Sequence, residues 1–215
     1  MATQPPKLPS RETETRPKQP GPPQNSSGKE RSLNELIREA PTQPELNLAY
    51  SEIDNQGSHR AAAILAAAFV EDALRFVFKA KFRALRNKEY EEIFGGNGPL
   101  SSFSSAINLG YALGFYGREA KSDLHVIRRV RNVFAHAMKP ITFETPLIVR
   151  EVAKLKYIDW KRQSGEAVFI FRNSPPFDNE NRKGYADHCR VLINDVMLEA
   201  LGGAWRSQPM TNRVI

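Results

Sequence analysis

The chain has 215 residues, of which 31 are Lys or Arg and 24 are Asp or Glu, so its formal net charge is +7. This length accommodates one ordinary domain with a tail, or two small domains. The single cysteine excludes an intramolecular disulfide and any zinc site built on several cysteines, as is typical of a reducing compartment. The longest apolar run, Ala61–Val70, is too short to span a bilayer, and the N-terminus lacks an apolar signal core. We therefore expect a cytoplasmic protein with no membrane segment.

Residues 1–31 contain seven of the fifteen prolines and a single large aliphatic residue besides Met1, Leu8. Such a segment cannot bury enough apolar surface to offset the entropy of ordering it, so we predict a disordered tail. The tail carries a net charge of +3 and leaves +4 of the +7 for the other 184 residues. That remainder permits contact with RNA or DNA but does not require it.

Helical patterns dominate the rest of the chain and predict an all-α helical bundle. Ser32 and Glu35 form a capping box that predicts a short helix ending at Ala40. Further helices are predicted over residues 58–85, 100–113, 118–138, 145–155 and 182–201. The helix over 58–85 is apolar around most of its circumference, which is typical of a helix at the centre of a bundle.

Residues 156–181 have no clear helical period. Tyr157–Trp160 and Ala167–Phe171 flank a polar segment and are compatible with a small β-hairpin inserted into the bundle, and a loop follows. We accordingly expect a disordered tail over 1–31, a helical domain over 32–205 and a flexible C-terminus over 206–215.

Arg131 falls within an apolar arc when the helix over 118–138 is drawn at about 100° per residue. The arc consists of Leu124, Ile127, Val130, Phe134, Ala135 and Met138. A guanidinium in such a place needs a carboxylate partner. Asp72 lies on a comparable arc of the central helix, so we predict a structural pair of Asp72 and Arg131, with Glu71 as second choice. The alternative is that Arg131 reaches the bundle edge along its aliphatic stem.

A polar strip runs beside that arc on the same helix and consists of His125, Arg128, Asn132 and His136, with Arg129 at its edge. These side chains can bind a phosphate, and an imidazole can transfer a proton. His125, Arg128 and Arg129 are therefore candidate binding residues, with a solvated polar face as the alternative. The four histidines lack metal-ligand spacing, so we expect neither a metal nor a cofactor.

Three segments resemble the MltR family, the mannitol operon repressors: Ser58–Leu74, Gly98–Gly114 and Asp123–His136. The similarity runs over about residues 57–150. It implies an all-helical regulator of a sugar-alcohol operon that has no obvious DNA-binding motif. We therefore expect a non-catalytic protein that acts in negative regulation of transcription through a protein partner or as a homodimer.

Arg131–His136 also resembles the R-x4-H signature of HEPN domains, helical bundles that often dimerise. Many HEPN domains are metal-independent ribonucleases, and others bind nucleotides or RNA. The resemblance implies that Arg131 and Asn132 position a phosphate and that His136 serves in acid–base catalysis. Because Arg131 and His136 are about 140° apart on a helix, a shared site needs a frayed helix end or two chains. The alternative function is thus an endoribonuclease or an RNA-binding, toxin-like protein.

Overall fold

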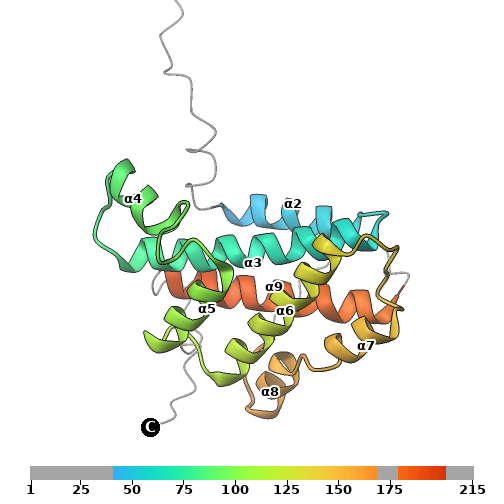
Figure 1. Cartoon of the computed structure of the whole chain (residues 1–215). Helices are drawn as coiled ribbons and strands as arrows, with labels where there is room; N and C mark the ends of the chain where they lie inside the picture. The colour runs from blue at the N-terminus through green and yellow to red at the C-terminus, as the bar shows by residue number, and fades with distance from the viewer. Residues whose placement is uncertain (1–40, 169–178, 202–215) are drawn as a thin grey trace, which may run out of the picture. The chain divides into compact units, whose positions relative to one another are not determined.

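The structure, a computed structural model, describes residues 41–168 and 179–201. All regular structure in these two ranges is helical, which confirms the predicted all-α fold (Figure 1). The first helices are α2 (Gln43–Asp54), α3 (His59–Lys81), α4 (Asn87–Phe94) and α5 (Phe103–Ala112). The others are α6 (Arg118–His136), α7 (Pro146–Val152), α8 (Tyr157–Gln163) and α9 (Glu180–Leu201). None of these helices is long and apolar enough to cross a membrane.

The helices predicted from periodicity are present as α3, α5, α6, α7 and α9, with ends shifted by a few residues. The predicted tail, the short helix before Ala40 and the predicted C-terminal segment lie outside the described residues.

α3 is the central helix of the described bundle, as predicted. Its largest interface is with α9, which runs beside it, and it also packs against α6, α5 and α2 (Figure 1). The Ser58 side chain accepts the backbone N–H of Ala61 and caps the start of α3. Ala63, Ala66 and Ala67 are fully buried, and such small side chains allow neighbouring helices to approach closely.

A group of aromatic side chains joins α3, α6 and α9. Phe143 lies 5.0 Å from Phe134 of α6 and 5.3 Å from Tyr185 of α9, measured between ring centroids. The Tyr185 hydroxyl donates to the carbonyl of Ala63 in α3 at 3.1 Å. The buried tyrosine therefore keeps its polar atom bonded while its ring fills the core.

The end of α6 is fixed by Arg60, from the first turn of α3. Its guanidinium donates to the carbonyls of Phe134 at 2.7 Å and Ala137 at 2.8 Å. These carbonyls belong to the last turn and the cap of the helix, where intrahelical donors are lacking. α6 therefore ends at His136, two residues before the predicted end. Met138 lies beyond the helix and is fully exposed, so its predicted place in the apolar arc is wrong.

Ala135 is also exposed, whereas the other apolar members of the arc are buried. The buried members are Leu124, Ile127, Val130 and Phe134. The apolar face of α6 is therefore narrower near its C-terminus than the sequence suggests.

Two helices, α2 and α4, do not appear among the predicted elements. At the start of α2, Pro44 occupies the first turn, where a missing N–H costs nothing. The Glu45 carboxylate accepts the backbone N–H of Thr42 at 2.7 Å and completes the cap. Pro44 therefore stands in the first turn of a helix that the sequence pattern did not predict. The same kind of contact, from Arg86 N–H to Glu89 at 2.8 Å, starts the short polar helix α4.

The predicted hairpin is wrong in its first arm, because Tyr157–Gln163 forms helix α8. The carboxylate of Asp123 in α6 accepts the backbone N–H groups of Lys156 at 3.1 Å and Tyr157 at 2.9 Å. A buried carboxylate from a distant helix thus caps the first turn of α8. Most of the predicted second arm lies outside the described residues.

Arg190 of α9 is fully buried and joins α9 to the end of α2. Its guanidinium forms ion pairs with Asp54 and, at 3.0 Å, with Asp187. It also lies 5.8 Å from the centre of the Tyr50 ring. Removing one partner of such a group leaves charges uncompensated in the interior.

We predict that Arg190→Met lowers the free energy of unfolding by about 3–5 kcal/mol, because Asp54 and Asp187 lose their buried cation. Urea unfolding followed by circular dichroism measures the change. Arg83→Met, at an exposed position, should stay within about 0.5 kcal/mol of the wild type. Equal stability of Arg190→Met and Arg83→Met would contradict the assigned role of Arg190.

Candidate functional site

Arg131 pairs with Glu71, the second choice from the sequence, and not with Asp72. Its Nη2 lies 2.9 Å from Glu71 Oε2. Asp72 is exposed on α3, one residue and therefore about 100° further around the helix. The predicted Asp72–Arg131 pair is thus wrong, because α6 packs on the side of α3 that carries Glu71.

Glu71 binds two arginines at once. Its Oε1 accepts from Arg75 at 3.1 Å, while its Oε2 accepts from Arg131. The Arg131 side chain is 31% exposed, and its Nη1 donates to Asn132 Oδ1 at 3.1 Å. Arg131 is therefore paired at the edge of the bundle, which combines the two alternatives that the sequence left open.

His136 does not share a site with Arg131 within one chain. α6 is a regular helix up to His136, and Arg60 holds the carbonyls at its end, so the frayed end that the sequence allowed is absent from this described segment. The two residues are about 140° apart around the axis and about 7.5 Å apart along it. His136 is exposed. A joint site of Arg131, Asn132 and His136 would therefore need a second chain.

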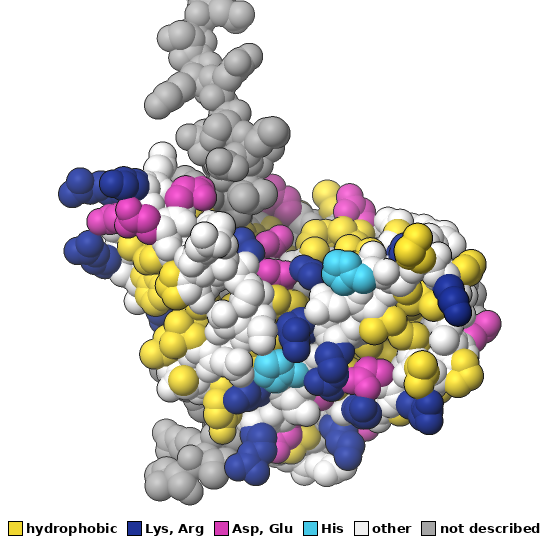
Figure 2. Space-filling model, viewed as in Figure 1, with side chains coloured by type: hydrophobic (Ala, Val, Ile, Leu, Met, Phe, Trp, Pro, Cys, Tyr) yellow, Lys and Arg dark blue, Asp and Glu magenta, His cyan; other side chains and the backbone are white. Residues whose placement is uncertain are grey.

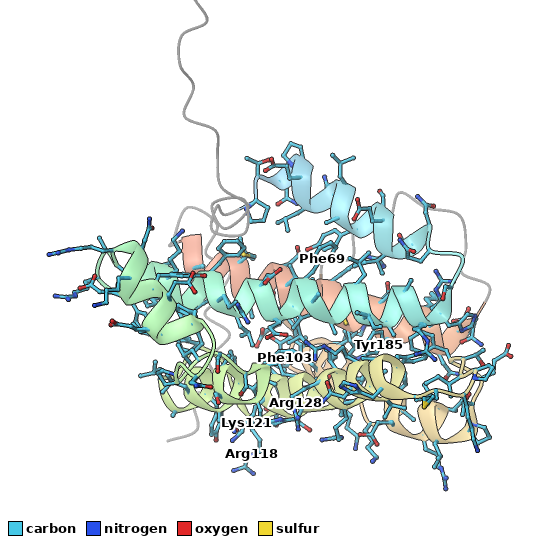
Figure 3. All side chains as sticks on the ribbon, turned by 45° about the horizontal axis from the view of Figure 1, so that its top comes forward. Phe69, Phe103, Arg118, Lys121, Arg128 and Tyr185 are labelled. Atoms are coloured by element: carbon cyan, nitrogen blue, oxygen red, sulfur yellow. The ribbon has the colours of Figure 1, made fainter. Side chains whose placement is uncertain are left out.

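The outward face of α6 carries polar side chains along its whole length. We call this surface the α6 stripe, and it consists of Arg118, Lys121, His125, Arg128, Arg129, Asn132 and His136. Figure 2 shows Lys, Arg and His side chains gathered across this face. In Figure 3, Arg118 and Lys121 lie on the side of α6 opposite the layer that holds Tyr185. The stripe has no carboxylate of its own.

Three cations of the α6 stripe have no carboxylate within 4 Å in the described part of the chain, and these are Arg118, Lys121 and Arg128. Arg129 differs, because its Nε pairs with Glu151 of α7. Lys121 Nζ lies 4.3 Å from the centre of the Tyr111 ring, which is a cation–π contact. The unpaired positive charge is therefore concentrated over the first three turns of α6.

His125 lies among these cations, and its ring Nε2 is 3.2 Å from Asn108 Oδ1 of α5. Partial burial lowers the pKa of His125, and repulsion from Arg128 and Lys121 lowers it further. The neutral imidazole is therefore the main form at pH 7. When its proton is on Nε2, this nitrogen donates a hydrogen bond to Asn108 Oδ1. An anion bound beside it would favour the charged form.

The sequence interpretation identified His125, Arg128 and Arg129 but missed Arg118 and Lys121. The same spacing of three or four residues, extended towards the N-terminus from His125, would have found both. Cys189 is buried, and burial raises the pKa of its thiol well above the usual range, so it is not an activated nucleophile. In the described ranges, no group of three or more His, Cys, Asp or Glu could hold a metal ion.

The described fold is that of a helical bundle with its polar stripe on one outer helix. No protein-family model and no curated protein sequence matches the chain. A chain in the X-ray structure of the MtlR–HPr complex from Escherichia coli is similar in structure, with a TM-score of 0.54 and 18% sequence identity. The similarity covers 71% of this chain and 98% of that chain. It shows that the two proteins share a fold.

We predict that Arg131→Ala lowers the free energy of unfolding by about 1–2 kcal/mol, since the pair is partly exposed and Glu71 keeps Arg75. Chemical denaturation measures it, with Asp72→Asn as the control that should stay within about 0.5 kcal/mol of the wild type. A decrease of about 3–5 kcal/mol in the free energy of unfolding would instead indicate that the Arg131–Glu71 ion pair is fully buried.

Proposed function

We propose that the protein is an MltR-like regulator that acts in negative regulation of transcription by binding another protein, without catalysis. The observation that carries this proposal is the structural similarity to MtlR, which extends over 98% of that chain. That protein was crystallised in complex with HPr, and HPr is therefore the first candidate partner here. The three sequence segments that resemble the MltR family lie inside the same helical domain.

The contacts of Arg131 support a non-catalytic role. Its guanidinium is occupied by Glu71 and Asn132, and His136 lies on another side of the helix. One chain thus offers no assembled pair of a phosphate-binding arginine and a proton-transferring histidine. In the α6 stripe, Arg118, Arg129 and His136 are exposed and the other four side chains are half-buried, so part of the stripe is accessible to a partner.

We expect purified HPr to bind the full chain with a dissociation constant of roughly 1–10 μM, typical of a transient regulatory contact. Isothermal titration calorimetry measures the affinity. His136→Ala should bind HPr within about twofold of the wild type, because a regulator does not need the histidine as an acid or base. Absence of binding at about 100 μM HPr would overturn the choice of partner.

The alternative is a HEPN-type endoribonuclease or RNA-binding protein, in which Arg131, Asn132 and His136 of two chains meet in a homodimer. The exposure of His136, next to Asn132 on the α6 stripe, favours this alternative. Our proposal predicts that the protein cleaves no RNA in the presence of EDTA. The measurement is incubation with single-stranded and structured RNAs, followed by gel electrophoresis. If the wild type and the neighbouring variant Lys139→Ala cleave RNA and His136→Ala does not, the protein is a nuclease and the regulator proposal is wrong.

A further inference from the structure

Exposed apolar side chains lie at the end of α5, directly before the unpaired cations of α6. Leu109 and Tyr111 are each 37% exposed, and Leu113 is 50% exposed. Only the turn over residues 114–117 separates Leu113 from Arg118. We call this combined surface the α5–α6 corner: Leu109, Tyr111 and Leu113 with Arg118, Lys121 and Arg128. Figure 2 shows hydrophobic and basic side chains next to each other over this part of the molecule.

Close packing fixes the turn that joins α5 to α6 in the α5–α6 corner. The Tyr116 hydroxyl donates to the carbonyl of Ile107 in α5 at 2.7 Å. A Cβ added at Gly110 would lie 2.6 Å from that hydroxyl oxygen, so the turn can approach α5 only because residue 110 is glycine. Gly114 has a φ of +74°, which lets the chain reverse between the helices. The exposed leucines and the cations are therefore presented together before any partner binds, which lowers the entropic cost of binding.

Lys121 connects the two kinds of side chain in the corner. Its ammonium lies over the Tyr111 ring, and in the described part of the chain it has no carboxylate within 4 Å. Tyr111 is itself 37% exposed, so a carboxylate that pairs with Lys121 binds next to an exposed aromatic side chain. The corner thus offers charge attraction and apolar contact to the same ligand.

Charge argues against two occupants that the chain itself could supply. Residues 1–31 carry a net charge of +3 and would be repelled by Arg118, Lys121 and Arg128. A second copy that used the same corner across a two-fold axis would place these cations against one another.

Nucleic acid, as an external ligand, would match the charge of the cations but would leave Leu109 and Leu113 without apolar partners.

We propose that the α5–α6 corner binds a protein whose surface carries acidic side chains around an exposed apolar one. This inference rests on the proposed function, in which the partner is a protein. It adds the surface to which that protein binds and the types of side chain that make the contact. Carboxylates of the partner pair with Lys121 and Arg128, and its apolar side chain packs against Leu109 and Leu113. The charges accelerate encounter, and Leu109 and Leu113, once covered by the partner, provide the apolar contact.

The test uses the full chain and a synthetic helical peptide of about 20 residues, long enough to follow α6. The peptide carries Glu on its flanks and a stripe of Leu, and fluorescence anisotropy measures its binding. We expect Lys121→Glu/Arg128→Glu to weaken binding at least about tenfold. Arg83→Glu/Lys88→Glu, which reverses the same number of charges near and within α4, should change affinity less than about twofold.

Two further probes distinguish this surface from a general polyanion site. The same peptide with Ser in place of every Leu, and a single-stranded RNA of equal net charge, should each bind at least about tenfold more weakly. In nuclear magnetic resonance titrations, the Leu peptide should raise the pKa of His125, because carboxylates offset the nearby cations. Equal affinity for the Ser peptide or the RNA would overturn the proposal.

The inference and the proposed function fail in different ways. If HPr binds but the acidic Leu peptide does not, the corner is not the docking surface and the function stands. If the peptide binds and HPr does not, the corner stands and HPr is the wrong partner. No binding of the peptide at about 1 mM would overturn the inference directly.

Discussion

The close packing of α9 against α3 is the constraint on which the rest of the described bundle depends. The buried alanines of α3 let α9 approach, and Tyr185 then reaches the carbonyl of Ala63 across the interface. α6 packs on the same aromatic group through Phe134, and Arg60 fixes where it ends. Once its apolar face is buried in this way, together with Asp123, the side chains of the α6 stripe lie on the opposite, solvent-facing side. The orientation of the α6 stripe is therefore a consequence of the core.

The sequence predicted the helices whose own apolar period is strong, which are also those that form the core. It failed where a helix depends on contacts at its first turn. α2 has Pro44 in its first turn, and this proline looks like a helix breaker unless Glu45 is known to complete the cap. α8 begins where Asp123, more than thirty residues earlier in the chain, accepts its first N–H groups. No local pattern contains that information, so the aromatic and β-branched composition of Tyr157–Trp160 misleadingly favoured a strand.

The candidate site shows the same limit at the level of single side chains. A helical wheel placed Arg131 near a carboxylate of α3, but Glu71 and Asp72 differ by only one residue. Choosing between them requires knowing which side of α3 faces α6, and that is decided by packing. Arg118 and Lys121 could have been found from spacing alone. Their importance became clear only because the structure places them beside the exposed leucines of α5 and away from carboxylates.

The two functional hypotheses use different ends of α6. A shared site across a homodimer needs Asn132 and His136, near the C-terminus, whereas the proposed docking surface needs Arg118, Lys121 and Arg128, nearer the N-terminus. The ends differ in chemistry: the cations over the first three turns have no carboxylate partner in the described ranges. Arg129 and Arg131 each pair with a carboxylate, Glu151 and Glu71, which also binds a second cation. The cations without a carboxylate partner thus begin beside the exposed leucines of α5, whereas those nearer His136 are held in ion pairs. This separation of charge from the exposed histidine is a physical reason to prefer protein binding over RNA cleavage.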